Sequence, residues 1–109
     1  MEEKSAVASL GALAQPVRLR VFRALVGTGP EGMNPGDLGL LLDVAPSTLS
    51  FHLRELMHSG LVQQEREGRH LVYRASLEHM NELMDYLAAH CCLGAGCEEL
   101  AAVRVRRAC

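Results

Sequence analysis

Tryptophan is absent from this chain of 109 residues, and aromatic residues make up only 4% of it. A core must therefore be built from leucine, valine, alanine and methionine, and a hydrophobic fraction of 49% is enough for one. The length predicts a single domain over residues 1–109. Because so small a domain buries a modest share of its surface, dimerisation would add stability.

Long apolar runs are also missing. No segment approaches the ~20 apolar residues that a membrane-spanning helix needs. The first four residues, Met1-Glu2-Glu3-Lys4, lack the basic-then-apolar order of a secretory signal. The sequence therefore predicts a cytoplasmic protein with no membrane partner.

An excess of positive charge is missing too, because the formal net charge is −2. This balance argues against a protein that coats nucleic acid without specificity. It leaves room for a local basic face, since phosphate contact depends on where lysine and arginine lie.

Cysteine is absent from the first 90 residues, and the four cysteines then follow within a short C-terminal segment: Cys91, Cys92, Cys97 and Cys109. Without a secretory signal we expect these thiols to be reduced. Clustered reduced cysteines favour a ligand set or a redox switch over a disulfide framework.

Proline, glycine and apolar spacing divide the rest of the chain into helices and one hairpin. Helices are predicted over residues 5–14, 16–26, 35–42, 46–58 and about 77–92. Side chains expected to cap them are Ser5, Asn34, Ser47 and Ser76. In the third helix we expect four leucines to face the core: Leu38, Leu40, Leu41 and Leu42.

Between the last two helices the apolar period changes from that of a helix to that of strands. Two β-like runs, 61–66 and 69–74, are joined by Glu67-Gly68, with glycine where a tight turn needs a positive φ. The order is that of a mainly α protein with a β-hairpin, a winged helix-turn-helix. In such a fold the helix at about 46–58 is the expected recognition helix and the hairpin at about 61–74 is the wing, while the cysteines mark about 90–109 as the candidate sensor segment.

The recognition helix carries the side chains expected to read DNA. We place its solvent face at Ser47, Thr48, Ser50, Phe51, His52 and Arg54, which are mostly short hydroxyls and nitrogen donors near a helix N-terminus. The hairpin adds local positive charge at Arg66, Arg69, His70 and Arg74. An ordinary amphipathic helix with serine caps is the alternative interpretation.

Two segments resemble the ArsR/SmtB family of metal-sensing repressors. One is Pro46-Ser-Thr-Leu-Ser-Phe-His-Leu-Arg-Glu-Leu, followed by Gly60-Leu-Val and Glu67-Gly-Arg-His-Leu-Val-Tyr73, and the other is Leu13-Ala-Gln-Pro-Val-Arg-Leu-Arg-Val-Phe-Arg-Ala-Leu25. The resemblance covers residues ~5–90. It implies a homodimer that binds double-stranded operator DNA, with contacts from Ser47, Thr48, Ser50 and His52. Phe51 stands where many members carry arginine.

Family members differ in where they bind metal, and two of the known places are not complete here. The founding arsenic sensors hold cysteines in the third helix, and residues 34–43 contain none. Zinc sensors use four ligands on the last helix. This chain matches two of them with His79 and His90 but has Leu77 and Leu93 at the other two, so we expect no zinc site there.

The third place is the cysteine segment. Cys91 and Cys92 would share a helix end, and Gly94-Ala95-Gly96 lets the chain return Cys97 to them. Three thiolates suit trivalent arsenic or antimony, and Cys109 is a candidate fourth ligand for a divalent soft metal such as cadmium, lead or zinc. The arrangement resembles that of family members with a C-terminal cysteine pair plus a third cysteine, which respond to trivalent arsenic.

These observations predict an arsenite-responsive repressor and not an enzyme, because no cysteine lies in a recognisable catalytic arrangement. The alternatives are a repressor that responds to cadmium, lead or zinc, one that responds to thiol oxidation or persulfide, and a member in which the cysteines are passive. A metallochaperone or metal-storage protein would leave the hairpin and the recognition helix unexplained.

Overall fold

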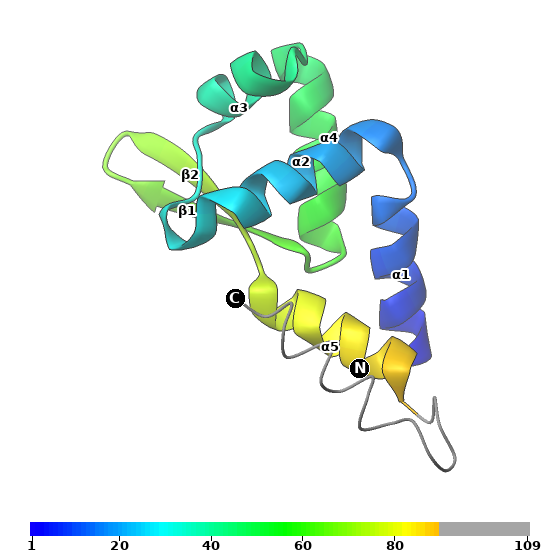
Figure 1. The fold of residues 1–109 in the computed structure, drawn as a ribbon. Helices are drawn as coiled ribbons and strands as arrows, with labels where there is room; N and C mark the ends of the chain where they lie inside the picture. Colours follow the sequence, from blue (N-terminus) through cyan, green and yellow to red (C-terminus); the bar gives the residue numbers. More distant parts are fainter. Residues whose placement is uncertain (90–109) are drawn as a thin grey trace.

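A computed structural model describes residues 1–89 of the chain. The elements follow in the order α1 (Glu3–Leu13), α2 (Pro16–Thr28), the 3-10 helix η1 (Gly29–Glu31), α3 (Pro35–Leu42), α4 (Pro46–His58), β1 (Val62–Glu67), β2 (His70–Ala75) and α5 (Leu77–Ala88). The predicted mainly α winged helix-turn-helix is confirmed (Figure 1). In the described part of the chain, no helix is both long and apolar enough to cross a membrane.

Proline and polar caps explain where the helices begin. Prolines occupy the first turns of α2, α3 and α4, where a missing N–H costs no hydrogen bond. Asn34 caps α3 and Ser76 caps α5, as predicted. The other two predicted caps are wrong: Ser5 lies inside α1, and the N-cap of α4 is Ala45, which has no side-chain oxygen to offer.

The core lies where α2, α3 and α4 meet the inner ends of the hairpin strands. Its buried members are Ala12, Val21, Phe22, Leu25, Leu38, Leu49, Leu53, Leu56, Leu61, Val62 and Tyr73. In α3 only Leu38 is buried, whereas Leu40 and Leu41 are 84% and 62% exposed, so the predicted core side was too wide. A helix of eight residues packed along one side buries one narrow stripe.

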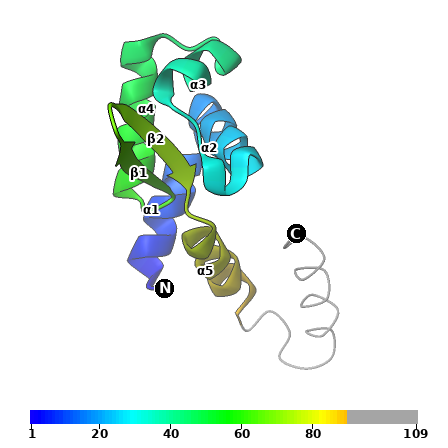
Figure 2. The same cartoon turned by 90° about the vertical axis from the view of Figure 1, so that its left-hand side faces the viewer.

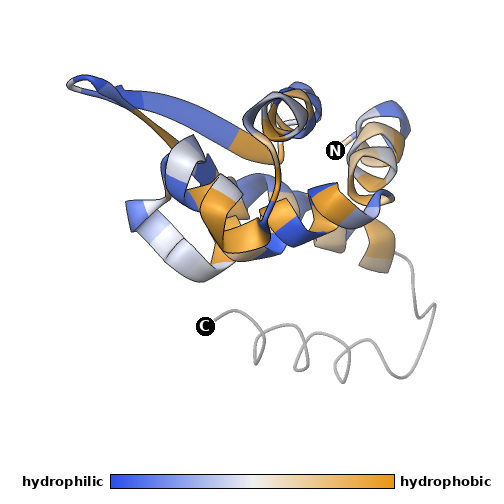
Figure 3. Ribbon diagram, turned by 90° about the horizontal axis from the view of Figure 1, so that it is seen from above, coloured by the Kyte–Doolittle hydropathy of each residue, from blue (hydrophilic) through white to orange (hydrophobic). Residues whose placement is uncertain are grey.

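The two strands form an antiparallel hairpin in which Val62 pairs with Ala75 and Glu67 with His70. The turn is Gly68-Arg69, one residue later than predicted, and Gly68 has the expected positive φ of 64°. Outside the hairpin, Met33 pairs with Tyr73, and the two residues exchange two backbone hydrogen bonds. No local sequence signal predicted this pairing. The projecting end of the hairpin is hydrophilic, and apolar residues gather where it joins the body (Figure 3).

The first and last helices lie together, at the end of the molecule opposite α3 (Figures 1 and 2). The helix α5 ends at Ala88, earlier than the predicted residue 92. His90 and the four cysteines lie outside the described residues.

Candidate nucleic-acid interface

The exposed face of α4 is polar toward its N-terminus. Ser47, Thr48, Ser50 and Arg54 are all exposed, and Phe51 among them is 49% exposed. The helices α2, α3 and α5 each begin with a side chain that accepts a backbone N–H, but α4 does not. The first-turn N–H groups of α4 are thus left for another acceptor, and this positive helix end suits a phosphate.

His52 does not belong to that face, so its predicted solvent exposure is wrong. The side chain is 7% exposed and lies on the buried stripe with Leu49, Leu53 and Leu56. Its Nδ1 and the Nε of Arg18 are buried without a hydrogen-bond partner. Burial first, and then the positive charge of Arg18, lower the pKa of His52, while Glu55 acts in the opposite direction.

The wing carries a second group of exposed nitrogen donors. Arg66, Arg69 and His70 are exposed around the hairpin turn, as expected for side chains that meet phosphate. Since β1 begins four residues after α4 ends and packs against it, the fold holds the hairpin close to α4.

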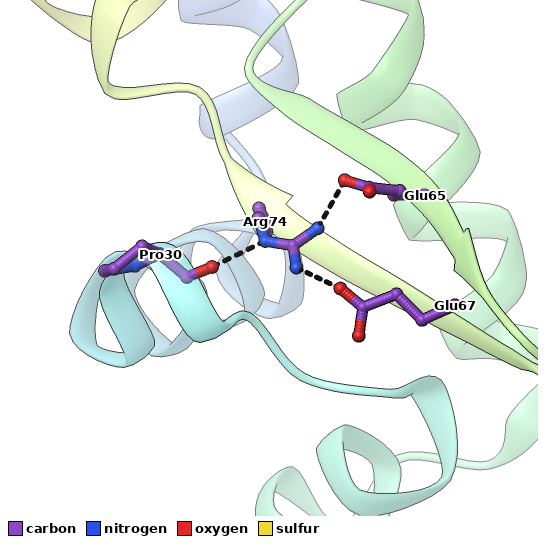
Figure 4. Close-up of polar contacts among 4 residues, drawn as sticks. All are labelled: Pro30, Glu65, Glu67 and Arg74. Carbon is purple, nitrogen blue, oxygen red and sulfur yellow. Dashed lines mark hydrogen bonds and ion pairs between the residues drawn. The ribbon is translucent and has the colours of Figure 1, made fainter.

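Arg74, also predicted to add free positive charge, is instead held by neighbours (Figure 4). Its guanidinium pairs with Glu65 at 2.9 Å and Glu67 at 2.6 Å, and its Nε donates to the carbonyl oxygen of Pro30 at 2.6 Å. The hydrogen bond to Glu67 is the main reason that the pKa of Arg74 is raised. Arg74 therefore fastens the wing to η1, and its charge is already balanced.

A polar junction joins α1, α5 and the end of α4. The buried hydroxyl of Ser9 lies 2.8 Å from Nε2 of His79 and donates to the carbonyl oxygen of Ser59 at 3.4 Å. The contact between Ser9 and His79 is the shorter of the two, and which of these residues donates depends on the tautomer of the imidazole. Gly60 has φ 87°, and a Cβ there would lie 2.9 Å from Cε1 of His79. No sequence signal linked His79 to Ser9, which lies seventy residues away in the chain.

Comparisons with known proteins agree with this geometry. Residues 13–65 match a helix-turn-helix domain model. The chain is 36% identical over 82 residues to the transcriptional regulator NmtR of Mycobacterium tuberculosis, an alignment that covers 75% of this chain and 66% of NmtR. It is 32% identical to the solved structure of HlyU from Vibrio cholerae, with 84% of this chain and all of HlyU covered and a TM-score of 0.62.

The chain belongs to the ArsR/SmtB family. An ArsR-like transcriptional regulator from Rhodococcus shares the fold at a TM-score of 0.70 and 24% identity, over 95% of this chain and 86% of that one. The chain spans only 17% of another matching regulator, YdfF of Bacillus subtilis. Membership makes this protein a DNA-binding transcriptional regulator and not an enzyme.

Within residues 1–89 of this ArsR/SmtB regulator, no three histidine, cysteine, aspartate or glutamate side chains come together as a metal site. His79 is engaged with Ser9, and His90, the other histidine of the incomplete zinc motif, lies outside the described residues. The cysteine segment expected to bind the effector also lies outside the described residues. The identity of the effector is therefore a proposal.

Proposed function

We propose that the protein is a repressor that binds operator DNA as a homodimer and is released by trivalent arsenic or antimony. In this proposal α4 enters the major groove and the wing follows the adjoining backbone. The uncapped N-terminus of α4, surrounded by exposed hydroxyl groups, is the observation that best supports it. These groups offer short donors and acceptors to base edges and phosphates.

The direct contacts are divided between two elements. We assign base and phosphate contacts on α4 to Ser47, Thr48, Ser50 and Arg54, and phosphate contacts on the wing to Arg66, Arg69 and His70. His52 acts indirectly, because a side chain that is 7% exposed cannot reach a base edge.

The dimer is assigned to α1 and α5, which keep exposed apolar side chains although they pack on each other: Val7, Leu10, Leu77, Tyr86 and Leu87. A similar fold, the DNA-binding domain Mb0332 of Mycobacterium bovis, is described as homodimeric. A two-fold dimer would place its half-sites about one turn of DNA apart, ~34–36 Å.

The effector is assigned to Cys91, Cys92 and Cys97, which as thiolates form a soft three-coordinate set. Cys91 follows the last residue of α5 by three positions, and α5 also carries His79, which meets the hydroxyl of Ser9 that contacts Ser59, the C-cap of α4. An effector bound next to α5 would therefore act on a helix that is linked through Ser9 to the C-terminal end of the recognition helix. With Cys109 as a fourth ligand, the segment would suit cadmium, lead or zinc, and oxidation of the same thiols is the other alternative.

Fluorescence anisotropy of a labelled duplex, selected by the protein from a random-sequence pool, tests the proposal. Arsenite should weaken binding by about 5- to 150-fold, the usual range of coupling between two sites. Cys91→Ser, Cys92→Ser and Cys97→Ser should each bind the duplex normally but no longer respond to arsenite. Cys109→Ser is the matched control and should respond like the parent.

Four outcomes would contradict parts of the proposal. Release of the triple Cys91→Ser, Cys92→Ser, Cys97→Ser protein by arsenite would place the site elsewhere. Release by cadmium, lead or zinc but not arsenite would favour the divalent alternative, and release by peroxide that dithiothreitol reverses would favour a redox switch. Failure to select any duplex would overturn the assignment of α4 and the wing to DNA.

A further inference from the structure

Phe51 is a large apolar side chain in the middle of the proposed reading face. On a helix its neighbours are three and four residues away, and these include Ser47, Thr48 and Arg54. All three are exposed, and Phe51 itself is 49% exposed. The ring therefore stands among the side chains assigned to DNA.

The fold does not account for an aromatic side chain at this position. The chain has only two phenylalanines; Phe22 is buried in the core, and Phe51 is not a member of it. Within the described residues, the ring of Phe51 meets that of His52 on the same helix, with centroids 5.4 Å apart and planes at 64°. That edge-on contact with a buried imidazole orients the ring but does not cover it.

The chemistry of phenylalanine restricts what it can recognise in a major groove. The side chain neither donates nor accepts a conventional hydrogen bond, so it cannot read the N7, O6, N6 or N4 groups of the bases. It carries no charge for phosphate. The apolar group that unmodified B-DNA presents in the major groove is the 5-methyl of thymine.

We propose that Phe51 contacts the 5-methyl group of one thymine in each half-site and so selects thymine at that position. This inference rests on the proposed function, because it requires α4 to lie in the major groove. It differs from hydrogen-bonded readout in depending on a single methyl group, which can be removed from the DNA without altering base pairing.

The test uses the full-length protein and the duplex that it selects from a random-sequence pool. Each thymidine is replaced in turn by deoxyuridine, which lacks only the methyl group, and the dissociation constant is measured by anisotropy. Wild-type protein should lose about fourfold in affinity at one position per half-site, and roughly fifteenfold when both are replaced, as expected for one buried methyl each.

The same replacements are then made against two variants in a double-mutant cycle. Phe51→Ala should bind the thymidine and deoxyuridine duplexes equally well. Phe51→Leu, which keeps an apolar side chain, should retain part of the discrimination. Far-UV circular dichroism checks that both variants fold.

The outcomes separate this inference from the proposed function. If wild-type protein selects a duplex but no deoxyuridine replacement weakens binding, the thymine contact is wrong while DNA binding stands. If folded Phe51→Ala loses as much affinity as wild type on the deoxyuridine duplex, the methyl group is read by another residue. If no duplex is selected at all, both proposals fail.

Discussion

Among the single residues, His52 links the core to the reading face. It lies three positions after Leu49 and four before Leu56, so helical spacing alone places it on the buried stripe of α4. The sequence instead predicted His52 on the solvent face, because its ring nitrogens could serve as donors to DNA beside Arg54. The helical period was the better guide, because an imidazole can be buried when it is uncharged.

The pKa of His52 makes stability depend on pH in a defined direction. Burial and Arg18 lower the folded-state pKa below the unfolded value of about 6.5. Above that value the imidazole is neutral in both states, and the contribution of His52 to stability is fully present. As the pH falls below it, the unfolded state takes up a proton first, so the free energy of unfolding should decrease until the pH passes the folded-state pKa.

Urea unfolding at pH 7.5, 6.5 and 5.5 measures this dependence. Wild type should lose more stability between pH 7.5 and 5.5 than His52→Gln, which has no imidazole to protonate. The control is His58→Gln, which alters an exposed histidine on the same helix and should follow wild type. Parallel curves for wild type and His52→Gln would show that His52 does not titrate in this way.

At the scale of elements, the wing divides its arginines between DNA and the fold. Arg66 and Arg69 are exposed, whereas Arg74 is paired with two glutamates and Pro30. Arg66→Ala and Arg69→Ala should each flatten the plot of log affinity against log salt concentration by ~0.9 for every phosphate that the variant no longer neutralises. Arg74→Gln should leave that slope unchanged but lower the melting temperature.

A salt series in the anisotropy assay with the selected duplex gives all three slopes. Arg74→Gln is the matched control, since it removes the same charge from the same hairpin. If Arg74→Gln reduced the salt slope as much as Arg66→Ala and Arg69→Ala do, the ion pairs of Arg74 would have to open on DNA. All three arginines would then contact phosphate.

The same scale shows which features a sequence can predict. Proline and glycine signals are local, so they located the starts of α2, α3 and α4, the end of α4 at His58 and the hairpin turn to within one residue. Exposure of Leu40 and Leu41 was not predictable in that way, because it depends on which neighbours cover α3. The Ser9–His79 contact and the Met33–Tyr73 pairing join distant segments, and periodicity within one helix carries no information about them.

At the scale of the whole molecule, the exposed apolar side chains of α1 and α5 imply a missing neighbour. Val7 and Leu10 are 63% and 42% exposed on α1, and Leu87 is 56% exposed on α5. The two helices lie together at one end of the molecule, so their apolar residues can form part of one self-complementary surface. In the proposed dimer, pairing through this surface would present two recognition helices to DNA together.

A charge placed on that surface should separate the protomers. Wild-type protein at micromolar concentration should sediment as a dimer, whereas Leu87→Glu should sediment as a monomer with an unchanged circular dichroism spectrum, because a buried unpaired carboxylate disfavours association. The control is Leu40→Glu, which places the same charge on α3, where the side chain is 84% exposed, and should remain dimeric. The Leu87→Glu protein should also lose most of its affinity for a two-half-site duplex. A monomeric wild type, or a Leu87→Glu protein that is still dimeric, would place the dimer interface on another surface.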